Sequence, residues 1–183
     1  MAMELLAMPY ITTENGGYYS DAEAARSRIG HLQGIVKFWP YMAVVVAFQH
    51  WVYTNHNLAT DPAACDEKWQ ELYLKYVPGV DYDGLDDWVK TGWQRKLHIF
   101  RLPFYYIEYG LAQLGAVQVW GRALQNSEAA LHDYMQALKL GGTVTLPELY
   151  NTAGVKLAFD AETLGVAVEL IEQTIGKLEG AAQ

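Results

Sequence analysis

The segment from His98 to Trp120 constrains the fold more than any other part of the sequence. Pro103 suits the first turn of a helix, because a residue at that position needs no backbone N–H. From Tyr105 onward, aromatic and small apolar side chains recur at helical spacing and lie near one face. Gly110 and Gly115 each weaken a helix interior by ~1 kcal/mol relative to alanine. We therefore expect a helix that begins near Pro103 and lets another backbone approach closely at its two glycines.

Three tyrosines, Tyr105, Tyr106 and Tyr109, lie at the start of this expected helix. Tyr106 and Tyr109 are three positions apart, so their rings should lie one helical turn from each other. An aromatic stripe at helical spacing is most often part of a core, with the hydroxyl groups reaching its rim. The spacing alone leaves two interpretations open, namely a packed aromatic wall and the wall of a binding site.

The rest of the sequence also predicts helices, each bounded by a glycine, a proline or a capping residue. Starts are marked by capping boxes at Ser20–Glu23 and Thr145–Glu148 and by expected caps at Asp61, Ser127 and Asp160. The expected helical segments are 1–8, 20–39, 41–58, 62–76, 87–97, 128–140, 146–153 and a last helix from 161 to the fraying tail at Gly180, with Pro40 kinking or restarting the chain between the second and the third. No segment alternates as a strand does, and no repeat or low-complexity linker divides the chain. The sequence therefore predicts an all-α, multi-helix bundle that forms one domain over residues 1–183.

The composition restricts the expected partners and compartment. The chain has 21 acidic residues against 13 lysines and arginines, which argues against nucleic acid or an anionic membrane as a partner. Its longest apolar run, Tyr41–Phe48, is too short to cross a bilayer. The single cysteine, Cys65, excludes an internal disulfide and suits a reducing compartment. We expect a cytoplasmic protein that binds neither nucleic acid nor membrane.

No combination of residues in the sequence has the spacing of a metal site. The chain contains no His-Glu pair, and its histidines are not four positions apart, as two zinc ligands on one helix would be. Glu128 and His132 are four positions apart, but no third ligand accompanies them. The acidic turn over residues 81–87 lacks the glutamate that closes a calcium loop. We expect this chain by itself to bind no metal.

Three segments carry a more specific signal. The first is His98 followed by the run Pro103-Phe104-Tyr105-Tyr106-Ile107-Glu108-Tyr109, the second is Met1-Ala2-Met3-Glu4-Leu5-Leu6, and the third is Phe48–Tyr53. These segments resemble the C-terminal part of the oligoendopeptidase F branch of the M3 zinc metallopeptidases. The resemblance extends from Met1 to about Leu178. It implies the neurolysin-like catalytic fold of that family, of which this chain would be the C-terminal portion.

The resemblance also implies the chemistry. Members of the family hydrolyse short peptides with a zinc-activated water, so proteolysis by a zinc metalloendopeptidase is the implied activity. His98 and one of the tyrosines, Tyr106 or Tyr109 first and Tyr105 second, would stabilise the negative charge that develops on the carbonyl oxygen. The His-Glu-x-x-His motif and the third zinc ligand of the family are missing from this chain. Zinc is therefore expected in the intact enzyme, whereas this chain would be inactive alone.

Further roles are implied for residues around this pair. Tyr105 would bind the backbone of a short peptide. Arg101 would meet a substrate carboxylate, although a salt bridge to a neighbouring helix is an equally good interpretation. Glu4 would support the zinc ligands from behind, whereas without the resemblance it is simply a solvated carboxylate.

Two functional hypotheses remain open at this point. In the first, the chain is the substrate-binding portion of an oligopeptidase, and it needs the N-terminal portion that carries the His-Glu-x-x-His motif or associates with itself through an exposed surface. In the second, the chain is a non-catalytic helical module that derives from such a peptidase and binds peptides or other proteins. Both hypotheses leave zinc off this chain, so its absence does not separate them.

Overall fold

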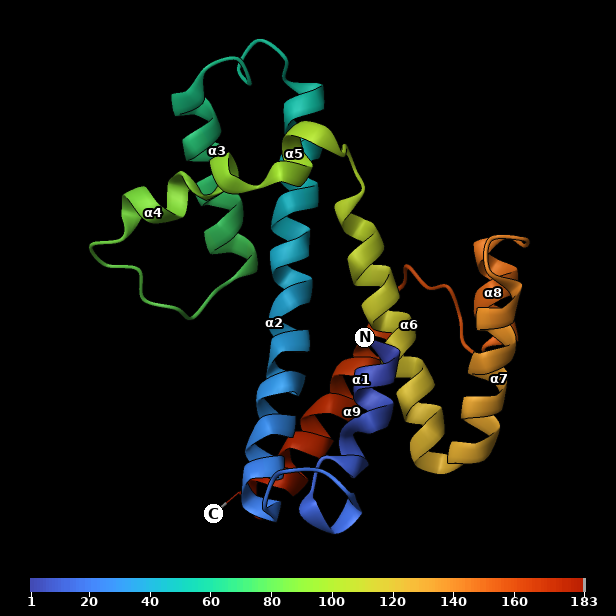
Figure 1. The fold of residues 1–183 in the computed structure, drawn as a ribbon. Helices are drawn as coiled ribbons and strands as arrows, with labels where there is room; N and C mark the ends of the chain where they lie inside the picture. The colour runs from blue at the N-terminus through green and yellow to red at the C-terminus, as the bar shows by residue number, and fades with distance from the viewer. Residues whose placement is uncertain (183) are drawn as a thin grey trace. The chain divides into compact units, whose positions relative to one another are not determined.

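The computed structural model describes residues 1–182, which contain helices and no strand (Figure 1). The predicted all-α fold is therefore confirmed. The α-helices are α1 (Ala2–Ala7), α2 (Asp21–Thr54), α3 (Pro62–Tyr76), α4 (Asp86–Lys90), α5 (Leu97–Arg101), α6 (Tyr106–Gln125), α7 (Ser127–Leu140), α8 (Leu146–Thr152) and α9 (Ala161–Glu179). Short 3-10 helices cover Met8–Tyr10, Thr13–Asn15 and Gly92–Arg95.

The chain divides into two compact units. Unit 1 consists of Met1–Val36 together with the chain from Leu111 onward, and unit 2 is Lys37–Gly110. The boundaries between the units fall within the long helices α2 and α6, so each of these helices has one part in unit 1 and the other part in unit 2. The single domain over residues 1–183 stays a prediction.

Unit 2 is built around an aromatic core between α2 and α3. Phe48 of α2 is fully buried, and its ring centroid lies 5.3 Å from that of Trp69 of α3 and 5.9 Å from that of Trp93. The buried cluster comprises Val44, Val45, Phe48, Cys65, Trp69, Leu72 and Tyr106. Aromatic rings in edge-on contact stabilise such a core beyond the area they bury. This core gives the N-terminal end of α6 a rigid support.

Unit 1 combines small apolar contacts with one polar clamp. Helices α7 and α8 lie side by side, and Ala137 of α7 and Ala153, next to the end of α8, are buried with Val119 of α6 (Figure 1). The guanidinium of Arg122 donates to the carbonyl oxygen of Ala153 and to Oδ2 of Asp133, both at 2.7 Å. The clamp ties α6 to α7 and to the end of α8.

The helices begin at the capping residues that the sequence predicts, except that one cap lies one residue earlier. In the box at Ser20, the backbone N–H donates to Oε2 of Glu23 at 2.9 Å, and the box at Thr145–Glu148 is also complete. Asp61 and Asp160 cap their helices, as predicted. The prediction of Ser127 as a cap is wrong by one residue, because the side chain of Asn126 accepts from the backbone of α7.

Two predicted helices have different bounds in the structure. Helix α2 passes through Pro40 without a restart and ends at Thr54, before the predicted end at residue 58. A proline inside a helix costs about 3 kcal/mol, and the burial of Val44 and Val45 in the following turn offsets part of that cost. The predicted helix over residues 87–97 is wrong, because α4 ends at Lys90 and a separate 3-10 helix follows.

The two glycines of α6 admit side chains rather than a backbone, so the expected close approach of another backbone is wrong. A Cβ at Gly110 would overlap the side chain of Met42 in unit 2, and one at Gly115 would lie 2.7 Å from the ring of Tyr150 in unit 1. The carbonyl oxygen of Gly110 also accepts from the indole N–H of Trp39 at 3.2 Å. Each glycine therefore makes room for a large side chain.

Candidate functional site

His98 and Tyr109 form a hydrogen-bonded pair in unit 2. His98 lies on α5 and Tyr109 lies in the first turn of α6, and Nε2 of His98 is 3.2 Å from the hydroxyl oxygen of Tyr109. Their rings meet edge-on, with centroids 5.5 Å apart and an angle of 87° between the planes. Both side chains are half-buried, so the polar edge of the pair remains accessible. A phenol and an imidazole held in this way can present a hydrogen-bond donor to a bound oxygen atom.

The pair is brought together by a strained turn between α5 and α6. Phe104 has a φ of +58°, which is uncommon for a bulky residue. Its ring centroid lies 4.8 Å from that of His50 and 5.2 Å from that of Tyr53, and these contacts with α2 offset the strain. The prediction that Pro103 begins the helix is wrong, since α6 starts at Tyr106 after this turn.

Tyr106 lies beneath the pair and is only 7% exposed. Its ring centroid is 5.0 Å from that of His98 and 5.5 Å from that of Tyr109, which confirms that the two tyrosine rings lie one turn apart. Its hydroxyl accepts a hydrogen bond from Nζ of Lys96 at 3.1 Å. Tyr106 therefore packs as part of the core, whereas Tyr109 reaches the accessible edge.

Tyr105 and Arg101 lie on the accessible side of the same cluster. Tyr105 is 48% exposed, and its ring stands edge-on to that of Tyr109 at 5.5 Å. Arg101 is exposed, and within residues 1–182 its guanidinium forms no ion pair. The salt bridge that the sequence allowed for Arg101 is thus not formed among the described residues, and its charge remains available.

Glu4 is the one predicted site residue that belongs to unit 1. It is exposed, and its carboxylate lies 2.8 Å from the amino group of Met1. The hydrogen bond and the charge of that amino group lower the pKa of Glu4, and the charge of His31 acts in the same direction. Its predicted role beside zinc ligands stays a prediction.

Two residues near the pair were missed by sequence reasoning. Gln49 is almost fully buried, and its Nε2 donates to the carbonyl oxygen of His98 at 3.3 Å. Lys96 places its ammonium between the rings of Tyr41 and Tyr106. Burial disfavours the charge of Lys96, but hydrogen bonds to both tyrosine hydroxyls outweigh burial and raise its pKa. The only available signal was position, because Lys96 stands two residues before His98 and Gln49 lies in the segment Phe48–Tyr53.

The sequence model described as peptidase family M3 matches residues 1–165. The chain belongs to this family. The resemblance predicted from the aromatic run and its flanking segments is therefore confirmed.

Two solved structures are similar to this M3 chain along nearly all of its length. One is PZ peptidase A with an inhibitor, at a TM-score of 0.84 and 33% identity over 96% of this chain. The other is a protein described as an oligoendopeptidase F, at a TM-score of 0.85 and 32% identity over 100% of this chain. The chain spans only 30% and 31% of the length of these two proteins. None of the curated proteins matches it significantly.

The described part of this M3 chain does not provide a zinc site. Within residues 1–182, no group of three His, Cys, Asp or Glu side chains lies close enough to hold a metal ion. The residues present therefore do not fit the zinc that the resemblance implies for the intact enzyme.

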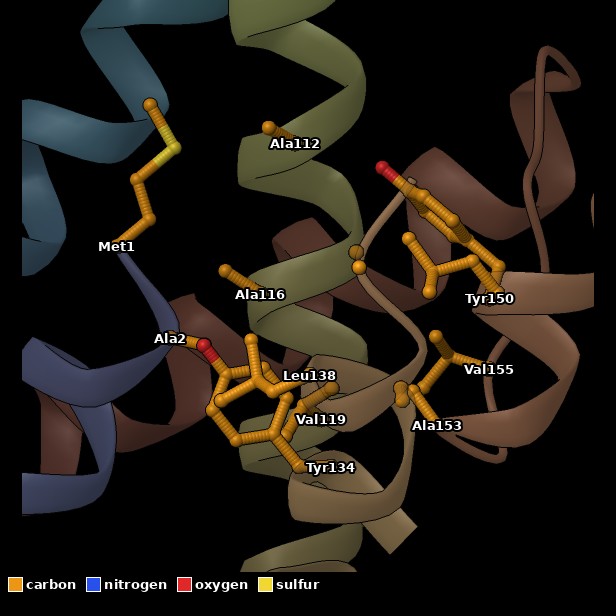
Figure 2. A pocket seen from close by; sticks show the side chains of 14 residues that line it. Met1, Ala2, Ala112, Ala116, Val119, Tyr134, Leu138, Tyr150, Ala153 and Val155 are labelled. Carbon is orange, nitrogen blue, oxygen red and sulfur yellow. The ribbon is translucent and has the colours of Figure 1, made fainter. Parts of the chain in front are cut away.

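An apolar pocket of about 340 Å³ lies in unit 1 (Figure 2). Small side chains of α6 form one of its walls, and the ring of Tyr150 from α8 lies over Gly115. Other lining residues are Met1, Ala2, Ala112, Ala116, Val119, Tyr134, Leu138, Ala153 and Val155. None of the six predicted site residues lines this pocket.

No helix among residues 1–182 is long and apolar enough to cross a membrane.

Proposed function

We propose that this M3 chain is the substrate-binding portion of a zinc-dependent oligoendopeptidase that hydrolyses short peptides. The single observation that carries the proposal is the contact between Nε2 of His98 and the hydroxyl of Tyr109 at 3.2 Å. Membership of peptidase family M3 supports the reaction class. The likeness to PZ peptidase A and to a protein described as an oligoendopeptidase F supports the class of substrate.

In this proposal the His98–Tyr109 pair stabilises negative charge on the oxygen of the peptide carbonyl during attack by water. A donor that is held in place before the reaction needs no reorganisation when the charge develops, and removing one such donor costs roughly 100-fold or more in kcat. Tyr109 is the better donor of the two candidate tyrosines, because its side chain is half-buried and meets His98, whereas Tyr106 is only 7% exposed. Tyr106 then supports the pair from below.

Two exposed side chains would bind the substrate itself. Tyr105 offers a ring face and a hydroxyl beside Tyr109, which suits the backbone of an extended peptide. Arg101, on the preceding helix, offers a guanidinium with no ion pair among residues 1–182, which suits the terminal carboxylate of a short peptide. A variant that lacks either group should weaken substrate binding more than it slows the chemical step.

Catalysis in this proposal needs a second component. The zinc ligands and the general base would come from an N-terminal portion with the His-Glu-x-x-His motif, so the chain alone should not cleave peptides. Self-association through an exposed surface is the other partner arrangement that the proposal allows. The single cysteine favours the cytoplasm as the compartment.

The test uses the chain mixed with a separately produced N-terminal portion of an M3 peptidase and a quenched fluorescent oligopeptide. Tyr109→Phe and His98→Ala should each lower kcat by roughly 100-fold with a smaller change in KM. Tyr76→Phe on α3 is the matched control, because it removes a tyrosine hydroxyl of unit 2 far along the chain from the pair. Wild-type kcat in both site variants would refute the proposal.

The mixing experiment also distinguishes the proposed peptidase portion from the alternative, a non-catalytic helical module that binds peptides or other proteins. A non-catalytic module would bind the oligopeptide in a titration but would give no hydrolysis with any N-terminal portion. Peptide binding that is lost in Tyr105→Ala, without turnover in the mixture, would favour this alternative.

A further inference from the structure

Lys96 is a charged residue held in an unusual environment of unit 2. Its Nζ lies 4.7 Å from the ring centroid of Tyr41 and 4.6 Å from that of Tyr106, so the ammonium is placed between two aromatic rings. It also donates to the hydroxyl of Tyr106 at 3.1 Å. Within residues 1–182 no carboxylate pairs with it. Among the described residues, aromatic faces and phenol oxygens are therefore what the charge meets.

An ammonium in this position constrains Tyr106 in two ways. Its charge attracts the face of the ring, which restricts how the ring can tilt. Its N–H group occupies one lone pair of the phenol oxygen and polarises the O–H bond of Tyr106. A methionine of similar length would fill the same space and would do neither.

The ring of Tyr106 in turn contacts both members of the pair. It meets His98 at an angle of 70° with centroids 5.0 Å apart, and it meets Tyr109 at 64° with centroids 5.5 Å apart. Any change in the tilt of this ring therefore changes the surface against which the imidazole and the phenol rest. The contacts form a continuous path from the ammonium to the hydrogen bond of the pair.

We propose that Lys96 is a positioning residue that fixes the ring of Tyr106 and thereby sets the orientation of the His98–Tyr109 pair. The geometric part stands on the contacts within unit 2, whereas its consequence for turnover rests on the proposed function. Lys96 itself touches neither substrate nor metal in this proposal. Nothing in the sequence singles it out, because a lysine before a short helix is normally a solvated side chain.

The direct test is the NMR spectrum of the 183-residue chain. The Hε1 signal of His98 lies within the ring-current field of Tyr106, so it reports the tilt of that ring. Lys96→Met should shift the His98 and Tyr109 ring signals, and Lys96→Arg should restore most of the wild-type shifts because it keeps the charge. Lys75→Met is the matched control, since Lys75 also lies over a tyrosine ring, that of Tyr76, at 5.2 Å.

A double-mutant cycle tests the path. In a Tyr106→Phe background, Lys96→Met should shift the His98 signal less than it does in the wild type, because the hydroxyl contact is already absent and only the attraction between the charge and the ring face is left to lose. Lys96→Gln, a smaller change, takes the place of Lys96→Met should the methionine variant not fold. Unchanged His98 and Tyr109 signals in the folded neutral variants would overturn the proposal.

Turnover provides a second readout that separates this inference from the proposed function. In the mixture with an N-terminal portion, Lys96→Met should lower kcat by roughly ten- to 100-fold with little change in KM, as misplaced catalytic groups do. Shifted ring signals with wild-type kcat would overturn the consequence for turnover. A wild-type mixture without any peptidase activity would count against the proposed function, and the NMR result alone would then decide the positioning role.

Discussion

Replacing Gly154 with alanine would disturb the clamp that joins three helices of unit 1. Gly154 follows α8 with a φ of +70°, and an alanine Cβ there would overlap the guanidinium of Arg122. That guanidinium donates to Ala153 and Asp133 at 2.7 Å each. The substitution therefore combines backbone strain with the loss of a charged contact.

The expected cost is the sum of these two parts. An L-residue with left-handed dihedral angles costs roughly 1–2 kcal/mol. Hydrogen bonds to a charged group contribute about 1.5–3 kcal/mol when buried. The side chains of Arg122 and Asp133 are 34% and 35% exposed, so we discount the loss for solvent screening to about 1–2 kcal/mol. Gly154→Ala should lower the free energy of unfolding by about 2–4 kcal/mol in total.

Urea denaturation of the 183-residue chain, followed by circular dichroism, measures this difference. Gly16→Ala is the matched control, because Gly16 has a φ of +87° but no atom within 4 Å of an added Cβ. It should show the backbone cost of roughly 1–2 kcal/mol alone. Gly165→Ala, inside α9 and facing open space, should instead stabilise the chain by about 0.5–1 kcal/mol. Equal losses in Gly154→Ala and Gly16→Ala would refute the role assigned to the clamp.

Three further predictions concern stability and titration. Phe48→Ala should cost about 3–5 kcal/mol in the same urea assay, because the ring is fully buried among three tryptophans, and a loss below 1 kcal/mol would contradict this packing. Lys156 and the amide and hydroxyl of Thr163 lower the pKa of Asp160, so its stabilising effect is full above its ordinary pKa near 3.9 and is lost as the pH falls through the lowered value. Asp160→Asn should therefore make the urea midpoint less sensitive to acid. An unchanged acid dependence in this variant would contradict the stabilising role of the Asp160 carboxylate. Burial and a hydrogen bond to a neighbouring tyrosine raise the pKa of Tyr73 to about 12, so its contribution is full below about pH 10 and is lost as the pH rises toward 12. An absorbance titration should show a late-ionising tyrosine that disappears in Tyr73→Phe, and its persistence there would refute the assignment.

The sequence by itself determined the local structure and the family. Capping boxes at Ser20 and Thr145 and the cap at Asp61 act over three residues or fewer, so their chemistry can be read without any tertiary contact. The run from Pro103 to Tyr109 carried the resemblance to the M3 family, which the comparison confirmed. Helical spacing also gave the distance of one turn between the rings of Tyr106 and Tyr109.

Tertiary packing alone decided the features that lack a local signal. Helix α2 continues through Pro40 because the core offsets the cost of a missing hydrogen bond, whereas spacing and propensity favour a break. The left-handed conformation of Phe104 persists because α2 holds its ring, and no rule of turn chemistry predicts it for phenylalanine.

The distinction between the two candidate tyrosines also comes from packing. Sequence spacing treats Tyr106 and Tyr109 alike, because both lie in the first turn of one helix. Tyr106 is buried in unit 2, and its hydroxyl accepts a hydrogen bond from the ammonium of Lys96. The hydroxyl of Tyr109 instead meets His98 at the accessible edge. These contacts join α6 to α5 and to Lys96 just before α5, and only the folded chain brings those side chains together.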